Sequence, residues 1–218
     1  MMSTSFDLIS GVLLLLILIV SISIHEWAHS WVAEKLGDAT PRLDGRNTLN
    51  PAAHFDPLGT FLMPMIFIFI LGSQVPFGWG KRIDINPSAF ENPKRDEILV
   101  WLAGPGGNAL VALVAAILGG LTFSVVPKFH ELMIMFIQVN CLIIIINLLP
   151  VPPLDGGFIL KVLSNMSEEL FIRLSYLCFV ILLGLFFFEP TRVVITLAQG
   201  LIEFLFFFIM SGIASLMV

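Results

Sequence analysis

The sequence predicts an all-α polytopic membrane protein with about five spanning helices. Of its 218 residues, 57% are hydrophobic and only 12% are charged, whereas soluble domains carry about 25% charged residues. Several apolar runs are long enough to cross a hydrocarbon core of about 30 Å. No linker divides the chain, so we expect one membrane-embedded domain over 1–218, with a core at about 6–165 and C-terminal helices at about 168–218. This composition predicts a lipid bilayer environment. The net charge of −5 is small and says little about partners, but the absence of a basic patch predicts no nucleic-acid partner.

The first expected span, Phe6 to Val32, ends in the pattern His-Glu-x-x-His. On a helix His25 and His29 lie on one face, so both imidazoles can reach one metal ion. Glu26 lies beside them and can take a proton from water at that metal. A single intramembrane histidine is usually a hydrogen-bonded packing residue. Two histidines four residues apart with a glutamate between them favour a metal site, because ionisable groups inside a span are costly.

A polar segment follows, and a short apolar run comes after it. His54 can be a third ligand or approach the site, although a surface or capping histidine is the favoured interpretation. Leu58 to Ser73 reaches only about 24 Å as a helix and contains Pro64, so it predicts either a short span or a re-entrant element. Residues 81–86 alternate polar and apolar side chains, which predicts a small β segment.

The second long span is expected at Ile98 to Val126. Asn92 and Pro93 offer a helix start just before it. Within the span lies Gly104-Pro105-Gly106-Gly107-Asn108, whose small residues allow neighbouring helices to approach closely in lipid. We interpret the glycines as packing residues and expect Asn108 to hydrogen-bond across a helix interface.

The third long span, Leu132 to Leu149, is followed by prolines and then by Asp155-Gly156-Gly157. The prolines end the helix, and the glycines let the chain turn sharply beside the Asp155 carboxylate. Catalytic zinc takes three protein ligands and keeps one open position, and Asp155 can complete a set with the two histidines. Without that pair, Asp155 would equally well be a cap of the next helix.

Two further runs, Leu170 to Phe188 and Val193 to Met217, complete the five expected spans. They show no obvious chemistry apart from Glu203, which can be a packing residue, a proton path or a gate element.

The charge distribution provides a test of topology. If the first and third long spans end on the same face, the short apolar run must leave that face and return to it. Nine of the eleven basic residues then lie on the face of the metal site. The positive-inside rule identifies this face as cytoplasmic.

Three spaced motifs carry a resemblance to a known family. The His-Glu-x-x-His pattern in a span, Gly-Pro-x-x-Asn at 104–108 and Asn-x-x-Pro-x-x-Pro-Leu-Asp-Gly at 147–156 resemble those of the site-2 proteases, which are intramembrane zinc metallopeptidases. The chain is most similar to the compact bacterial group without a PDZ domain, whose motif Asn-Pro-x-x-His-x-Asp-Pro-x-Gly-Thr is present from Asn50 to Thr60.

The resemblance implies a role for each matching residue. His25, His29 and Asp155 would bind one zinc ion per chain, Glu26 would be the catalytic base, and Asn147 would help hold the substrate or the oxyanion. Residues 81–86 resemble an edge to which an unwound substrate can add. His54 and Asn108 are candidate accessory residues.

The implied activity is regulated intramembrane proteolysis of a membrane protein that carries a transmembrane helix, at a bacterial inner membrane with the site towards the cytoplasm. A zinc-handling transporter and an inactive scaffold are the alternatives. Transporters usually show paired repeats, which are not evident here, and a scaffold would not need Glu26. The sequence indicates neither the substrate nor the oligomeric state.

Overall fold

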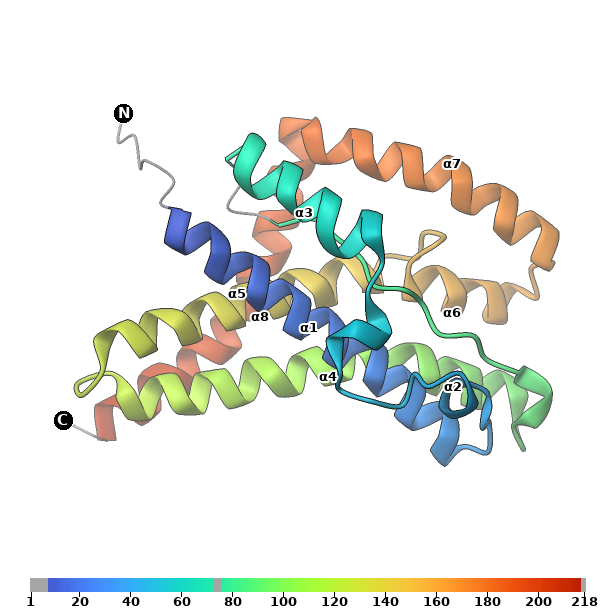
Figure 1. Cartoon of the computed structure of the whole chain (residues 1–218), viewed down its shortest axis with the longest axis horizontal. Helices are drawn as coiled ribbons and strands as arrows, with labels where there is room; N and C mark the ends of the chain where they lie inside the picture. The colour runs from blue at the N-terminus through green and yellow to red at the C-terminus, as the bar shows by residue number, and fades with distance from the viewer. Residues whose placement is uncertain (1–7, 73–75, 217–218) are drawn as a thin grey trace.

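The structure is a computed structural model that describes residues 8–72 and 76–216, and all the regular elements in these ranges are helical. Figure 1 shows a long antiparallel pair, α4 and α5, crossed by α1, with α6 and α7 to one side. In chain order the helices are α1 (Leu8–Lys35), α2 (Thr40–Leu43), η1 (Pro51–His54), η2 (Pro57–Leu62), α3 (Met63–Met65), η3 (Ile66–Ile70), η4 (Pro87–Ala89), α4 (Pro93–Thr122), α5 (Pro127–Leu148), α6 (Asp155–Ser164), α7 (Glu168–Phe187) and α8 (Glu189–Leu216). Phe6 and Met217, the outer ends of two expected spans, lie outside the described residues.

Proline fixes where the long helices begin. Both α4 and α5 start at a proline, which has no N–H to leave unpaired in the first turn. Asn92 precedes α4 as expected, but its side chain makes no capping bond. The Asp96 Oδ2 atom instead accepts the Asn92 backbone N–H at 2.9 Å. Both helices therefore begin about five residues earlier than the apolar runs alone predict.

Four helices in the described part of the chain are long and apolar enough to span a membrane: Leu8–Lys35, Pro93–Thr122, Pro127–Leu148 and Val193–Leu216. The expectation of five spans is not supported. The first two turns of α7 carry Glu168, Glu169 and Arg173, and the last two form an ion pair on its exposed surface. The remainder of that helix, 174–187, extends only about 21 Å at 1.5 Å per residue.

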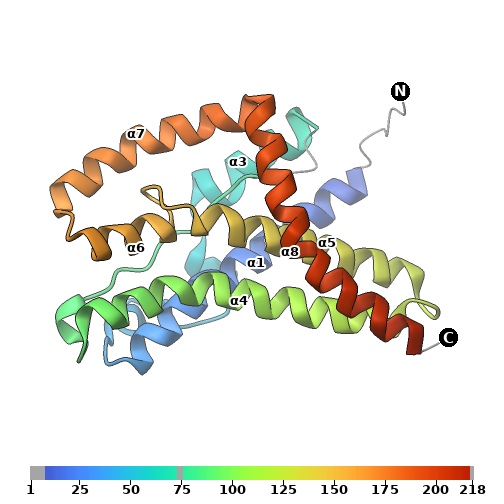
Figure 2. The same ribbon diagram turned by 180° about the vertical axis from the view of Figure 1, so that it is seen from behind.

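Two apolar clusters hold the long helices together. Figure 2 shows α8 crossing α4 and α5 from behind, and the cluster at this crossing consists of Ala112, Ala115, Ala116, Met133, Ile137, Cys141, Phe206 and Met210. Its alanines, together with Gly119 and Gly120 of α4, let α8 approach closely. The second cluster joins α1 and α5 to the short apolar helix through Ile68.

The short apolar helix Pro57–Ile70 leaves the centre of the molecule, and the chain then returns beside its start. Pro64 removes a backbone donor, and only α3 has α-helical geometry while its flanks are π-helical. After the return, the Trp79 N–H bonds to Gly59 O at 3.1 Å and the Lys81 N–H to His54 O at 2.9 Å. Both ends of this segment therefore lie together, as a re-entrant element requires.

The predicted β segment at 81–86 is wrong for the described residues, because none of them forms a strand. The side chains do alternate: Ile83 is buried and Ile85 half-buried, whereas Asp84 and Asn86 are exposed. The Lys81 N–H bonds to His54 O of η1 and the Asn86 N–H to the Asp38 carboxylate, so among the described residues no strand pairs with this segment. The alternating pattern therefore predicted which side chains are buried. It could not predict whether a neighbouring strand is present.

Candidate metal centre

Three side-chain atoms converge where α1, α4 and α6 meet. His25 Nε2 lies 3.1 Å from His29 Nε2 and 3.1 Å from Asp155 Oδ2. His29 Nε2 lies 3.4 Å from the same carboxylate oxygen. All three residues are buried, and in the described part of the chain they are the one group of three that can hold a metal ion. The structure therefore brings together the three ligands that the sequence predicts.

The spacing of these atoms fits tetrahedral zinc. Ligand bonds of about 2.0–2.1 Å in a tetrahedron separate the ligand atoms by about 3.3 Å, close to the three observed distances. Asp155 Oδ2 is also a buried oxygen that accepts no hydrogen bond. A buried polar atom without a partner is costly, and a cation at this point would satisfy it.

The outer nitrogens of both rings are held by acceptors. His25 Nδ1 lies 2.7 Å from Asn108 Oδ1, and His29 Nδ1 lies 2.6 Å from Val100 O. Since both acceptors require a donor, each Nδ1 carries the proton and each Nε2 presents its lone pair. The two Nε2 lone pairs and the Asp155 carboxylate oxygen then face one point, where they can coordinate a divalent cation.

Asn108 is fixed by a second layer of hydrogen bonds. It is fully buried, and its Nδ2 donates to Ser21 O at 3.1 Å and to Asn140 Oδ1 at 2.8 Å. Asn140 in turn donates to the Ser21 hydroxyl at 2.9 Å. These contacts orient the Asn108 carbonyl towards His25. The predicted hydrogen bond across the helix interface is confirmed, and it is made to a metal ligand.

Gly104 and Pro105 of α4 shape the floor of the centre. A Cβ atom on Gly104 would lie 2.3 Å from His29 Nε2 and 2.6 Å from His25 Cε1, so only glycine leaves room for both rings. Pro105 follows within the same helix and lacks an N–H, so it cannot donate to Trp101 O. Val100 O, one residue earlier, accepts the His29 proton. The glycines were predicted to be packing residues; Gly104 packs against the metal ligands themselves.

Asp155 is the first residue of α6 and does not cap that helix with its side chain. The chain folds back tightly before it. A Cβ atom on Gly156 would lie 2.4 Å from Leu149 O, and one on Gly157 would lie 2.6 Å from Val151 O. Neither glycine has a positive φ. The turn therefore depends on their small size rather than on left-handed backbone.

Glu26 is 7% exposed and lies beside Gly80 of the returning segment. A Cβ atom on Gly80 would lie 3.0 Å from Glu26 Cγ and 3.2 Å from Glu26 Oε1. Glu26, the three ligands and residues 76–80 line one cavity, so the returning segment forms one of its walls.

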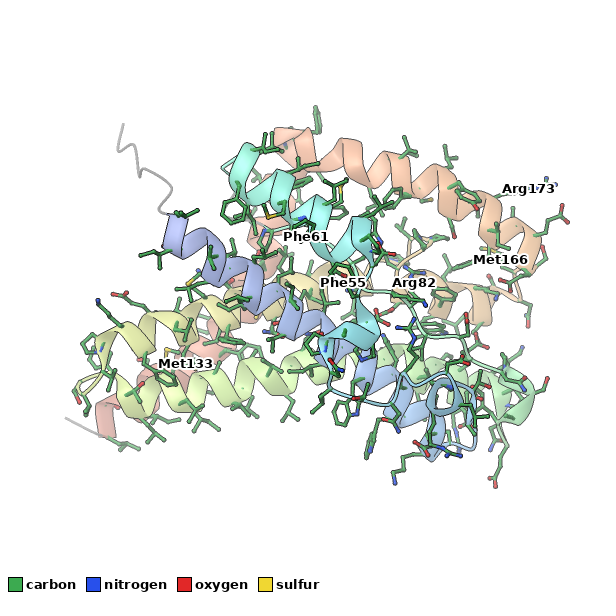
Figure 3. All side chains as sticks on the ribbon, in the orientation of Figure 1. Phe55, Phe61, Arg82, Met133, Met166 and Arg173 are labelled. Atoms are coloured by element: carbon green, nitrogen blue, oxygen red, sulfur yellow. The ribbon has the colours of Figure 1, made fainter. Side chains whose placement is uncertain are left out.

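A cavity of about 580 Å³ opens over the centre, and its walls are largely apolar. Asn147 lies on its wall at the end of α5, with its Nδ2 donating to Ile143 O at 3.0 Å. Arg82 also lines the cavity; Figure 3 shows it at the centre of the molecule, with its guanidinium 5.3 Å from the Phe158 ring of α6. Phe171 and Phe179 bring α7 to the same cavity.

His54 lies outside the metal group. It is 1% exposed, so it is not a surface residue either, and its Nε2 bonds to Thr48 O at 2.8 Å. Glu203 likewise lies away from the centre, with its carboxylate 2.6 Å from Gln199 Nε2 within α8. Neither residue supplies an atom to the triad.

Sequence reasoning missed the roles of Ser21, Asn140 and Gly80. Ser21 lies one helical turn before His25 on the same face, which is the one signal that could have indicated a contact. Asn140 and Gly80 reach the site from distant parts of the chain, and nothing in their local sequence indicates the contact.

Comparison with known proteins agrees with this geometry. A protein of Bacillus subtilis (strain 168) named "Putative zinc metalloprotease YwhC" is 37% identical over 156 residues, which cover 68% of this chain and 67% of that protein. The chain belongs to the site-2 protease family. A Mycobacterium tuberculosis (strain H37Rv) protein of this family, named "Putative zinc metalloprotease Rip2", is 30% identical over 144 residues.

The match takes in a smaller share of the mycobacterial relatives than of the B. subtilis protein. The match to the M. tuberculosis protein takes in 63% of this chain, and it spans about half the length of that relative, 52%. The Mycolicibacterium smegmatis protein of the same name is 30% identical over 154 residues, 56% of its length. No family model matches the chain, and no solved structure matches it.

Proposed function

We propose that this chain is an intramembrane zinc endopeptidase that hydrolyses a peptide bond in or near a transmembrane segment of a membrane protein. The observation that carries the proposal is the convergence of His25 Nε2, His29 Nε2 and Asp155 Oδ2, with the Glu26 carboxylate beside them. Two of these ligands and Glu26 lie on a helix long and apolar enough to cross a bilayer. An apolar cavity opens over the ligands, and the relatives are named zinc metalloproteases.

The neutral imidazoles of His25 and His29 and the carboxylate of Asp155 would bind the zinc ion. Zinc bound there would act as a Lewis acid, which would lower the pKa of bound water towards neutrality and polarise a carbonyl group. Glu26 accepts a proton from the attacking water and returns it to the leaving amine nitrogen. Its position against Gly80 keeps the carboxylate near the reacting atoms.

Asn147 can stabilise the substrate carbonyl oxygen as it gains negative charge. Its amide has two N–H donors, and one of them is used by Ile143 O. The second is free to donate into the cavity, which Asn147 lines. Hydrogen-bond donors aimed at developing charge accelerate acyl transfer.

The proposed substrate is a membrane protein whose transmembrane helix unwinds at the site. A helix hides its peptide bonds, so the scissile bond must become extended before it meets Glu26. The apolar lining of the cavity suits such a segment. In the topology that puts the ends of the first and third long spans on one face, nine of the eleven basic residues lie on the face of the metal site, which supports a cytoplasm-facing centre in a bacterial inner membrane.

The test is Glu26→Gln, compared with wild type and with Glu34→Gln as a matched control on the same helix. Glu34 pairs with Arg42 at 2.9 Å, away from the ligands. Each purified protein is assayed in detergent for zinc by mass spectrometry and for cleavage of a single-span membrane protein. We expect one zinc per chain in all three and cleavage by wild type and Glu34→Gln only.

Two results would contradict the proposal. Cleavage by Glu26→Gln at the wild-type rate would exclude Glu26 as the base. Zinc in wild type without cleavage of any single-span protein offered, including one carrying several helix-breaking residues in its span, would favour a transporter or a scaffold.

A further inference from the structure

The stretch Asn50–Thr60 forms a distinct motif that contributes no atom to the metal group. It lies instead against the segment that returns from the short apolar helix. Figure 3 labels Phe55, just before that helix, and Phe61 within it; these side chains are 43% and 50% exposed. His54, Gly59 and Thr60 are buried, and each of them contacts residues 79–81.

Three hydrogen bonds join the two segments. Gly59 O accepts the Trp79 N–H at 3.1 Å, and His54 O accepts the Lys81 N–H at 2.9 Å. The Thr60 hydroxyl donates to Trp79 O at 3.0 Å. Both polar groups of the Trp79 backbone and the N–H of Lys81 are therefore held from one side, which fixes the register of the segment.

The stretch is itself held in one conformation. Asp56 Oδ1 accepts the N–H groups of Leu58 and Gly59 at 3.0 and 2.6 Å, and the Thr60 hydroxyl accepts the Asp56 N–H at 3.0 Å. His54 Nε2 donates to Thr48 O at 2.8 Å. One hydroxyl, that of Thr60, thus joins the cap of the short helix to the returning segment.

Two glycines make the contact close. A Cβ atom on Gly59 would lie 2.4 Å from the Trp79 indole, so the ring packs directly on the helix backbone. Gly80, the next residue, packs on the Glu26 side chain. A shift of one residue would replace this glycine by Trp79 or Lys81 and would displace the carboxylate.

We propose that the Asn50–Thr60 stretch is a positioning element for Glu26. It holds residues 79–81 in one register, so that Gly80 confines the Glu26 carboxylate beside the metal ligands. Thr60 and His54 are positioning residues, and His54 acts through its backbone carbonyl rather than as a metal ligand. The inference rests on the proposed function in one respect, namely that Glu26 is the base.

The first test removes the Thr60 hydroxyl. Thr60→Val keeps the shape of the side chain and loses both hydrogen bonds, and we expect kcat to fall about tenfold with KM within about twofold and zinc content unchanged. Thr60→Ser restores the hydroxyl and is expected to restore kcat. Thr122→Val is the matched control, because the Thr122 hydroxyl bonds to Leu118 O within its own helix.

The second test does not depend on cleavage. Hydrogen exchange of the peptide 76–86, measured with zinc and after chelation, is expected to be about tenfold faster in Thr60→Val than in wild type. Gly59→Ala, which forces the Trp79 ring away, is expected to act in the same direction on kcat and on exchange. Thr122→Val is expected to leave both unchanged.

The outcomes separate this inference from the proposed function. An unchanged kcat in Thr60→Val, a loss confined to KM, or no rescue by Thr60→Ser overturns the positioning role while cleavage by wild type upholds the protease. If wild type cleaves nothing, the proposed function fails, and the role of the stretch in holding residues 79–81 is then judged by exchange alone. Equal exchange in Thr60→Val and wild type overturns it.

Discussion

Gly104→Ala is the most direct perturbation of the metal centre that does not substitute any of its three ligand residues. The new methyl carbon would lie 2.3 Å from His29 Nε2 and 2.6 Å from His25 Cε1, whereas ordinary contacts begin at 3.4 Å. One or both imidazoles must therefore move by about 1 Å. Zinc sites tolerate distance changes of only about 0.2 Å.

The expected magnitude follows from the cost of overpacking. Inserting a methyl group into a closely packed site costs about 1–3 kcal/mol, which corresponds to a zinc dissociation constant raised by about 5- to 150-fold. Alanine favours a helix over glycine by about 1 kcal/mol, so the fold of α4 is not expected to weaken. The substitution should therefore impair zinc binding without unfolding the protein.

Gly106→Ala in the same helix is the matched control, because a Cβ atom there meets nothing within 4 Å. Zinc affinity is measured for both variants and wild type by competition with a chromophoric chelator, and helix content by circular dichroism. Gly106→Ala should match wild type in both measurements. Zinc affinity within twofold of wild type in Gly104→Ala would refute the close approach of this helix to the two histidines.

Two other substitutions test the surroundings of the centre. Asn108→Leu removes the acceptor of the His25 Nδ1 proton, and we expect zinc affinity to fall about 10- to 100-fold in the same competition assay; undiminished affinity would show that the ring is oriented by other contacts. Asn147→Ala removes the donor on the cavity wall, so kcat should fall by about 10²-fold with zinc content unchanged. A rate equal to wild type in steady-state cleavage would exclude Asn147 from the reaction.

The sequence predicted much of the fold because lipid restricts the choices. Backbone polar groups must be satisfied within each apolar run, so the long runs had to be helices, and three of them are α1, α4 and α5. The start of α4 was less predictable, since Pro93 and Asp96 begin the helix in a polar segment. The alternation at 81–86 predicted which side chains are buried. It did not predict strand pairing, because hydrogen bonding between strands depends on a partner elsewhere in the chain.

The sequence predicted the metal ligands of the site, but not the contacts that position them. His25 and His29 share a face through helical geometry alone, and Asp155 was implied by the need for a third ligand. His54 has the chemistry of a ligand and is directed by its loop to Thr48 instead. Side-chain chemistry identifies candidates, but the backbone path decides which of them meet.

The sequence by itself determined the chemistry: a His-Glu-x-x-His pattern in an apolar helix, an aspartate after a proline turn, and a membrane environment. These features follow from composition and local periodicity. Only the tertiary structure decided that Asn108 orients His25, that Gly104 admits both rings, and that Gly80 confines Glu26. Those contacts join residues more than 50 positions apart, and their distances are set by how the helices and the returning segment pack, which no local pattern encodes.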